Sequence, residues 1–306
     1  MGRSRKACFA NLMISVVIVN YNRKDLLSQC LDSIRAQGFK DIEIIVVDNA
    51  SLDDSVEMLR AYYPEVRLIQ NTKNLLFCKP YNQGIDASKG NFVLCLNNDC
   101  FLDKDYLKEA LWAMGLDNNI GMVSGKILRM DRKAIDSTGL FLGRNRKAVE
   151  RGYGRKDKGQ YEKSGYVFGV SGSCAFFRKK MLLDIKDEFG YFDERFEMYY
   201  EDLDLCWRAN KKGWKAYYNP KAVAYHIRGG TAIVKDERAK CMGGLNLPYI
   251  KDELRKKYIL NRYRCIRKND TLRGILLNIP FILLYEIKIW GYMALIRFRK
   301  SLCWIK

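Results

Sequence analysis

Two amides and a carboxylate follow directly on an apolar run in the segment LNNDC at 96–100. Mg²⁺ and Mn²⁺ prefer oxygen ligands, and an ion that bridges diphosphate oxygens needs only one or two protein carboxylates. Asp99 is therefore the expected metal ligand, with Asn97 nearer to a ribose or to a metal-bound water. A plain turn uses the same residue types, so the position of this motif in the fold decides its meaning.

The segment EMYYEDLDLCWR at 197–208 holds four carboxylates within eight positions. Carboxylates this close disfavour one another's ionisation unless they face cations, a metal or substrate hydroxyls. Asp202 or Glu201, at the expected start of a helix, could act as the general base toward an acceptor hydroxyl. Asp204 and Arg208 are four residues apart and would pair on one helix face. Acidic residues at a helix start can also simply complement the helix dipole.

Two further residues, Asp48 and His226, are candidates for binding a nucleotide or a metal ion. Asp48 ends an apolar run, where a carboxylate can accept hydrogen bonds from a base or from ribose hydroxyls, although a turn or helix cap is as typical there. His226 is the one histidine of the chain, which excludes a zinc site built from several histidines. Arg228 and two glycines follow it, so a diphosphate-contacting loop with the imidazole as a metal ligand competes with a purely structural histidine.

The elements that must position these residues alternate along the chain. Apolar runs predict strands at 14–19, 42–47, 66–70 and 91–96, and helical spacing predicts helices at 24–36, 53–62 and 80–88. This alternation indicates a parallel sheet covered on both faces. Polar residues follow the strand ends at Asn20, Asp48, Asn71 and Asn97–Asp99. Because ligands bind at that edge of open α/β sheets, one site along one edge is expected.

The rest of the chain is less regular. Residues 143–165 are charged and contain glycines, which predicts a mobile loop that could close over the site. From about 245 the chain is basic, and 274–296 is nearly all apolar. Polar and proline interruptions favour an interfacial helix pair flanked by cations over a clean membrane span, with a helix packed on the domain as the alternative. The interruptions are Asn278, Pro280, Glu286 and Lys288.

These changes of character predict the domain organisation. We expect a disordered leader at 1–12, or translation starting at Met13, and a catalytic domain at 13–240. Its nucleotide half would span about 13–100 and its acceptor half about 101–240, followed by a helical tail at 241–306 for which membrane association is one of the two interpretations above.

Composition narrows the classes of protein. Apolar residues make up 48% and charged residues 29%, as in globular proteins. The net charge of +19 points to an anionic partner, namely nucleic acid, a phosphorylated small molecule or an acidic membrane surface. The ten cysteines show no C-x-x-C spacing, and the first twelve residues lack the apolar stretch of a signal peptide. Reduced, mostly buried thiols in a cytoplasmic protein are therefore expected.

Together these pieces resemble family 2 glycosyltransferases of the GT-A fold, particularly the rhamnosyltransferase-like branch. The matching stretches run in the family's order from about 14 to 230 and include SVVIVNYNRKDLLSQCLDSI, VVDNASLDDS, NTKNLLFCKPYNQGI, LCLNNDC, GSCAFFRKKML, FGYFDERFEMYYEDLDLCWRANKKGW and YHIRGG. The resemblance implies a Rossmann-like α/β fold with a mixed, mostly parallel central sheet and a C-terminal helical tail.

The resemblance also implies an activity. The chain would be an inverting enzyme that moves a sugar from a dTDP- or UDP-linked donor to a hydroxyl of a glycan or lipid-linked acceptor in cell-surface polysaccharide synthesis. It would work at the inner face of the cell membrane, touching anionic lipid through residues 245–306.

The family's residue roles carry over by motif. On the donor side, the resemblance implies nucleotide contacts by Asn20, Tyr21 and Asp48 and donor-pocket contacts by Asn74, Asn82 and Asn97. It implies that Asp99 and His226 hold Mg²⁺ or Mn²⁺ and that Arg228 neutralises the diphosphate. On the acceptor side, it implies proton abstraction by Asp202, acceptor binding by Glu201 and an acceptor cleft at Gly172 and Ser173. Two departures stand out. The motif is Asn-Asn-Asp with a single carboxylate, and Leu75–Leu76–Phe77 replaces the usual Gly-Phe after Asn74.

Two other classes share some of these features. A sugar nucleotidyltransferase would carry a glycine-rich loop after its first strand, where this chain has Asn-Tyr-Asn. A nucleic-acid-binding protein would fit the charge, but the basic residues concentrate in 126–165 and 235–270 instead of on a recognition element, and the acidic 193–204 cluster would repel phosphates. We therefore expect a sugar-nucleotide donor and no nucleic acid as partner.

Overall fold

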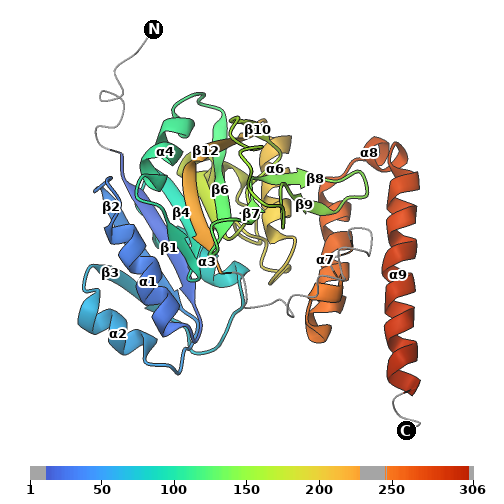
Figure 1. Cartoon of the computed structure of the whole chain (residues 1–306), viewed down its shortest axis with the longest axis horizontal. Coiled ribbons are helices and arrows are strands. Elements are labelled where there is room, and N and C mark those ends of the chain that lie inside the picture. The colour runs from blue at the N-terminus through green and yellow to red at the C-terminus, as the bar shows by residue number, and fades with distance from the viewer. Residues whose placement is uncertain (1–11, 228–244, 246, 303–306) are drawn as a thin grey trace. The chain divides into compact units, whose positions relative to one another are not determined.

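The computed structural model describes residues 12–227, 245 and 247–302. Its first part alternates strands and helices as the sequence predicts, with element ends shifted by one or two residues (Figure 1). The elements are β1 (Ile14–Asn20), α1 (Lys24–Arg35), β2 (Ile42–Asp48), α2 (Ser55–Tyr62), β3 (Val66–Gln70), α3 (Cys78–Ala87) and β4 (Phe92–Asn97).

The later part begins with short strands and ends in helices. Its elements are β5 (Cys100–Leu102), α4 (Tyr106–Met114), β6 (Ile120–Arg129), β7 (Ile135–Ser137), β8 (Leu140–Leu142), β9 (Ala148–Glu150), β10 (Gly165–Val167), β11 (Cys174–Arg178), α5 (Lys179–Ile185), α6 (Glu201–Lys211) and β12 (Lys215–His226). After the undescribed stretch come the short 3₁₀ turn Leu247–Tyr249, α7 (Asp252–Asn269), α8 (Leu272–Leu276) and α9 (Ile279–Leu302).

The central sheet is mixed and mostly parallel, as predicted. Its strand order is β10-β12-β6-β11-β4-β1-β2-β3, with β5 paired to β12 and β7 paired to β6. Strands β4, β1, β2 and β3 are parallel neighbours, whereas β11 is antiparallel to both β4 and β6. The register places Asn20 opposite Asp48, and Val19 opposite Asn97. The polar strand ends therefore meet at one edge of the sheet.

Alternating side chains of the strands form two apolar faces. On one face, Ile14, Val16 and Ile18 pack with α1, α2 and α4, and the buried residues of α1 recur at helical spacing, as Leu27, Cys30, Leu31 and Ile34 do. On the other face, α3 packs so closely that a Cβ on Gly84 would lie 2.2 Å from Val17 Cγ1. Each fully buried aliphatic side chain contributes roughly 1.5–3 kcal/mol, so these faces fix the strand ends firmly.

The segment predicted as a mobile loop at 143–165 contains ordered elements. Strand β9 pairs with β8, and β10 joins the edge of the main sheet. Lys126 on β6, nearly buried, pairs with Asp157 at 3.1 Å and with Glu162. Most of the segment otherwise lies outside helices and strands, as the sequence predicted, and ion pairs tie two of its charges to β6. Closure over the site stays a prediction.

The described residues divide into two compact units. One holds the residues up to Phe141 and those from Val149 to Ile227, and the other holds Leu142–Ala148 and the residues after Ile227. The tip of the β8–β9 hairpin therefore groups with the tail, which the predicted boundaries did not anticipate. The predicted leader at 1–12, apart from Leu12, and the predicted boundary at 240 lie outside the described residues.

The second unit is held by buried cations. Arg262 on α7 is fully buried, pairs with Glu286 on α9 and donates to the Asn145 carbonyl at 2.6 Å. Arg146 pairs with Asp270 at the end of α7. The predicted pair of apolar helices corresponds to α8 and α9. Glu286, which interrupts the apolar stretch in the sequence, therefore forms an ion pair within the unit, with Arg262.

The described cysteines are all buried and free, as the sequence predicted. They are Cys30, Cys78, Cys95, Cys100, Cys174, Cys206 and Cys265. Burial raises the pKa of the Cys30 thiol well above its usual value, because the thiolate would be desolvated. These thiols are therefore core residues and not nucleophiles.

Candidate active site

The ends of β1, β2 and β4 are joined by hydrogen bonds between buried polar side chains. The Asn20 amide donates to Asp48 Oδ1 and to Ser51 Oγ, both at 3.1 Å. The Asn98 amide donates to Asn20 Oδ1 at 2.8 Å, and the Ser51 backbone N–H donates to Asp48 Oδ2 at 2.9 Å. Asn20 and Asp48 are 0% and 2% exposed. The three strand ends thus form one pre-organised cluster, as predicted.

A second layer of amides orders the loop that leads into α3. Asn74 Oδ1 accepts from the Leu76 backbone N–H at 2.8 Å and from the Asn49 side chain at 3.2 Å. The Asn49 side chain also donates to the Leu76 carbonyl at 2.9 Å. Leu76, in the segment that departs from the family pattern, has a φ of 62°, a left-handed conformation that favours glycine. The departure therefore carries local backbone strain.

Asp99 and His226 meet across 127 positions of sequence. In the pairing of β12 with β5, His226 lies opposite Cys100, and the Ile227 backbone N–H donates to the Asp99 carbonyl at 3.0 Å. This register brings Asp99 Oδ1 to 3.1 Å from His226 Nε2. The other ring nitrogen, Nδ1, lies 2.8 Å from Oδ2 of Asp136. The imidazole is therefore held between two carboxylates.

The electrostatics of His226 reflect both of its neighbours. Burial alone would lower the pKa of the imidazole, but the hydrogen bonds and charges of Asp136 and Asp99 outweigh it and raise the pKa to about 9. His226 is 5% exposed and Asp136 is 1% exposed. The imidazole therefore lies between a buried carboxylate and a half-buried one, and both favour its charged form.

Asp202 lies at the start of α6, facing the segment that precedes β11. Its Oδ2 accepts from the Gly172 backbone N–H at 3.3 Å, and its Oδ1 accepts from the Leu203 backbone N–H at 2.7 Å. Next to Gly172, the Ser173 carbonyl accepts from the Asn97 backbone N–H at 2.9 Å. The acidic helix and the β4 end are thus connected through two adjacent residues, Gly172 and Ser173, which the sequence placed in an acceptor cleft.

Glu201 is buried beside Asp202. Its Oε2 has no hydrogen-bond partner among the described residues. Burial, followed by the charges of Asp202 and Asp204, raises the pKa of Glu201 well above its ordinary value. The lead-in to α6 is also strained, because Glu197, Tyr199 and Tyr200 have φ values of 58°, 70° and 71°. Strained backbone and the buried carboxyl group of Glu201 therefore lie directly before Asp202 in the chain.

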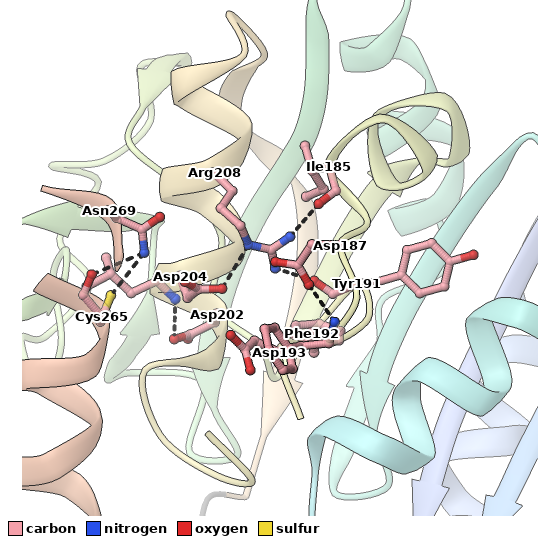
Figure 2. A network of polar contacts seen from close by, with 12 residues as sticks. Ile185, Asp187, Tyr191, Phe192, Asp193, Asp202, Asp204, Arg208, Cys265 and Asn269 are labelled. Atoms are coloured by element: carbon pink, nitrogen blue, oxygen red, sulfur yellow. Dashed lines mark hydrogen bonds and ion pairs between the residues drawn. The ribbon is translucent and has the colours of Figure 1, made fainter. Parts of the chain in front are cut away.

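One face of α6 is anchored by an ion pair. Arg208 donates to Asp204 at 2.9 Å, to the Ile185 carbonyl at 2.7 Å and to the Tyr191 carbonyl, as Figure 2 shows. Asp204 is 0% exposed, so this pair fixes the helix against the segment before it. The structure therefore gives Asp204 and Arg208 the structural role that their spacing suggested.

The remaining predicted site residues have the following contacts. Asn82 on α3 bonds the backbone of Phe192 in both directions, at 2.8 and 2.9 Å, and its place in the donor pocket stays a prediction. Tyr21 follows the β1 end and is 45% exposed. Asn97 accepts from the Tyr81 hydroxyl at 3.1 Å. Arg228 lies outside the described residues.

Sequence reasoning missed Asp136 and Tyr81. Asp136 lies in the stretch that the sequence left irregular, and a carboxylate in the short run AIDST has no spacing that connects it to His226. Tyr81 lies in the helix predicted at 80–88, and nothing in the local sequence marks it as a site residue. Only the sheet register and the packing of α3 bring these two side chains to the site.

The chain belongs to glycosyl transferase family 2, whose family model matches residues 15–185. It is 27% identical over 228 residues to the amylovoran biosynthesis glycosyltransferase AmsB of Erwinia amylovora, covering 71% of this chain and 70% of AmsB. It is 23% identical over 216 residues to the poly-beta-1,6-N-acetyl-D-glucosamine synthase of Staphylococcus aureus, covering 70% of this chain. The chain spans 50% of the length of that synthase. The predicted family is confirmed.

Solved structures support the predicted GT-A fold. The mannosyltransferase PcManGT from Pyrobaculum calidifontis, in complex with GDP-Man and Mn2+, aligns with a TM-score of 0.59 at 16% identity, covering 92% of this chain and 75% of that one. TarS of S. aureus aligns with a TM-score of 0.57 at 17% identity, covering 87% of this chain and 50% of that one. At these identities the likeness concerns the fold.

Proposed function

We propose that this chain is an inverting, metal-dependent glycosyltransferase that moves a sugar from a nucleoside-diphosphate donor to a hydroxyl of a glycan or lipid-linked acceptor. The observation that carries the proposal is the convergence at one sheet edge of Asp48, Asp99 with His226, and Asp202. A dTDP- or UDP-linked donor and a role in cell-surface polysaccharide synthesis complete the proposal; the relative AmsB is named a glycosyltransferase of amylovoran biosynthesis.

The donor atoms of Asp99 and His226 fit a divalent cation. Asp99 Oδ1 lies 3.1 Å from His226 Nε2, so a carboxylate oxygen and an imidazole nitrogen would be available to hold one ion between them. No group of three or more histidine, cysteine, aspartate or glutamate residues that could hold a metal occurs within the described residues. Two protein ligands leave positions for diphosphate oxygens and water, and a bound ion would neutralise charge on the departing diphosphate.

The protein's own groups perform the remaining steps. Asp48 and Asn20 orient the nucleoside, since their side chains are already locked together. Asp202 accepts the proton of the acceptor hydroxyl as that oxygen attacks the anomeric carbon. Two backbone N–H groups aim its carboxylate, and its neighbour Glu201, whose pKa is raised, favours the neutral form. Of the two acids, Asp202 is therefore the better base.

A thermal-shift screen tests the donor class. Full-length protein is heated with UDP, dTDP or GDP, each with and without Mn²⁺ or Mg²⁺. A ligand at 100 times its Kd stabilises the folded state by about 2.7 kcal/mol, so a cognate nucleotide raises the apparent midpoint only when the ion is present. Product analysis with the matching sugar nucleotides follows. No shift with any nucleotide and ion would contradict the proposal.

We also propose that the outer face of α8 and α9 rests on an anionic membrane surface. Large apolar side chains are exposed along it, namely Leu272, Leu276, Leu277, Leu283, Leu284, Ile287, Trp290 and Leu295. Within the described residues one stretch, Ile279–Ile296, is long and apolar enough to cross a membrane, with a mean hydropathy of 1.5 and 11% of it buried. Exposed cations on the same unit, Lys256, Arg264, Arg267, Arg273 and Lys288, would each gain about 1 kcal/mol near anionic lipid.

Flotation with vesicles of phosphatidylglycerol and phosphatidylcholine tests this contact. The double substitution Leu283→Gln/Ile287→Gln removes two side chains that are 56% and 69% exposed on one helix face. We expect it to weaken vesicle binding at least tenfold, because each buried methylene contributes about 0.8 kcal/mol. Leu183→Gln, at an equally exposed leucine of the first unit, is the control. Equal flotation of both variants would refute the docking face.

A further inference from the structure

We propose that Asp136 is a positioning residue that fixes the imidazole ring of His226 so that Nε2 is presented to the metal site beside Asp99. This inference rests on the proposed function, because it concerns the same site. The juxtaposition that supports it is a buried carboxylate 2.8 Å from Nδ1, on the ring edge opposite Asp99.

The backbone delivers Asp136 to this place through a β-bulge. In the pairing of β6 with β7, Ile127 lies opposite Ser137 and Leu128 lies opposite Ile135, so Asp136 is the extra residue between them. A bulge interrupts the ladder and re-aims the side chain of its extra residue. Asp136 is 1% exposed, and burying a carboxylate costs several kcal/mol unless a partner compensates. The bulge therefore places a buried carboxylate beside His226, which is its partner at 2.8 Å.

The sheet alone does not orient the imidazole ring. The register of β12 sets His226 opposite Cys100 on β5 and opposite Arg129 on β6, which fixes its backbone. Rotation about the side-chain bonds stays open until a ring atom is bonded. The hydrogen bond from Nδ1–H to Asp136 closes that freedom and points Nε2 at Asp99.

The same bond selects the tautomer. A neutral imidazole carries one proton, and only the nitrogen without it can bind a metal. With the proton held on Nδ1 by Asp136, the lone pair lies on Nε2. A carboxylate behind a metal-bound histidine generally fixes the ring and raises its basicity, and its loss typically weakens metal binding by about 10–100-fold.

Binding of Mn²⁺ to the full-length protein tests the assignment. The concentration of free Mn²⁺ is measured from its electron paramagnetic resonance signal, because Mn²⁺ that binds to the protein no longer gives that signal. We expect Asp136→Asn to weaken binding about tenfold and Asp136→Ala up to about 100-fold. Asp103→Asn is the matched control, since this carboxylate on the same β5–β12 pair accepts from the Tyr225 hydroxyl and does not touch the imidazole. It should bind Mn²⁺ as the wild type does.

A double-mutant cycle separates positioning from a merely structural role. If Asp136 acts through the imidazole, Asp136→Asn causes no further loss of Mn²⁺ binding in a His226→Asn background. A structural defect would lower binding in both backgrounds. Asp136→Asn is nearly isosteric, so it keeps the test available should Asp136→Ala fail to fold.

The single histidine of the chain gives a second readout. In protein with ¹⁵N-labelled histidine and no histidine tag, the Mg²⁺-loaded wild type should show the proton on Nδ1, and Asp136→Ala should lose that preference. Unchanged Mn²⁺ binding and an unchanged tautomer in the variants would overturn the inference while leaving the metal site intact. A wild type that binds no Mn²⁺ would overturn the inference together with the metal dependence of the proposed function.

Discussion

The donor edge, formed by the ends of β1, β2 and β4, and the acid side, formed by Gly172 and the start of α6, are built on opposite principles. At the donor edge each buried polar group has a hydrogen-bond partner: Asn20 bonds Asp48 and Asn98, and Asp48 bonds Ser51. At the acid side, Glu201 Oε2 is buried without a partner among the described residues, and three residues before α6 have left-handed backbones.

The difference separates a part of the site that is rigid before a ligand binds from a part that is suited to proton transfer. A satisfied polar cluster changes little when a ligand arrives, which suits binding of a constant nucleotide. Strained backbone and a buried carboxyl group with a raised pKa persist only where their surroundings hold them, and both lie directly before Asp202, the proposed base. Four substitutions can sharpen or break this contrast, and they are ordered here by expected effect.

Asp202→Asn should have the largest effect, on the acid side. Removing the base is expected to lower the transfer rate about 10²–10⁴-fold while nucleotide binding stays unchanged, because the carboxylate acts only on the acceptor hydroxyl. Initial rates and calorimetric titration with nucleotide and Mn²⁺ measure the two separately. Asp184→Asn, at an exposed carboxylate that bonds Trp214, is the control. Transfer near the wild-type rate would show that another group is the base.

Arg208→Met should have the largest effect on stability. It leaves the fully buried Asp204 without its cation, which typically costs about 3–5 kcal/mol. Urea unfolding monitored by fluorescence measures the loss. Arg35→Met removes the same kind of side chain from an exposed pair with Glu65, where about 0–1 kcal/mol is expected. Equal losses in the two variants would mean that α6 is not anchored by its ion pair.

Asp48→Asn tests the donor edge. A hydrogen bond to a charged group contributes about 1.5–3 kcal/mol, so nucleotide affinity should fall roughly 10–100-fold. Binding of Mn²⁺ alone should not change, since Asp99 and His226 are untouched. Calorimetry with each ligand checks both statements. Unchanged nucleotide affinity would leave Asp48 a structural residue that orders Ser51 and Asn20.

Gly172→Ala should have the smallest effect. An added Cβ would lie 3.3 Å from Phe77 Cζ and 3.6 Å from Asp202 Cβ, so the neighbours must shift slightly. We expect a loss of about 1 kcal/mol, or about fivefold, in transfer and little change in the melting midpoint. Gly165→Ala, whose Cβ would meet nothing within 4 Å, is the control for added bulk. A variant as active as the wild type would show that this close approach does not matter.

The donor edge was predictable because its information is local. Apolar runs of strand length ended at Asn20, Asp48 and Asn97, and parallel strands must bring their ends to one edge. Asp202 and His226 were candidates from their local sequence, each beside a structural alternative, and the family resemblance favoured the functional interpretation. The roles assigned to them stay predictions until the variants are measured.

The remaining features depended on long-range pairing. Asp136 reaches His226 through the β6–β7 bulge, and no periodicity marks a bulge in one sequence. The ion pairs of Lys126 with Asp157 and Glu162 join residues more than thirty positions apart, so nothing in the local sequence marked them. Asn82 was assigned to the donor pocket by motif, whereas tertiary packing directs its amide to Phe192.

The pairing of Asp99 with His226 has a consequence for the order of events during synthesis. The two residues are 127 positions apart, and β12, which carries the histidine, is the last of the described strands to leave the ribosome. Contacts of such high sequence separation form late and slowly. A nascent chain that has already folded its donor edge therefore still lacks the imidazole, so completion of that pair reports that the whole sheet has closed.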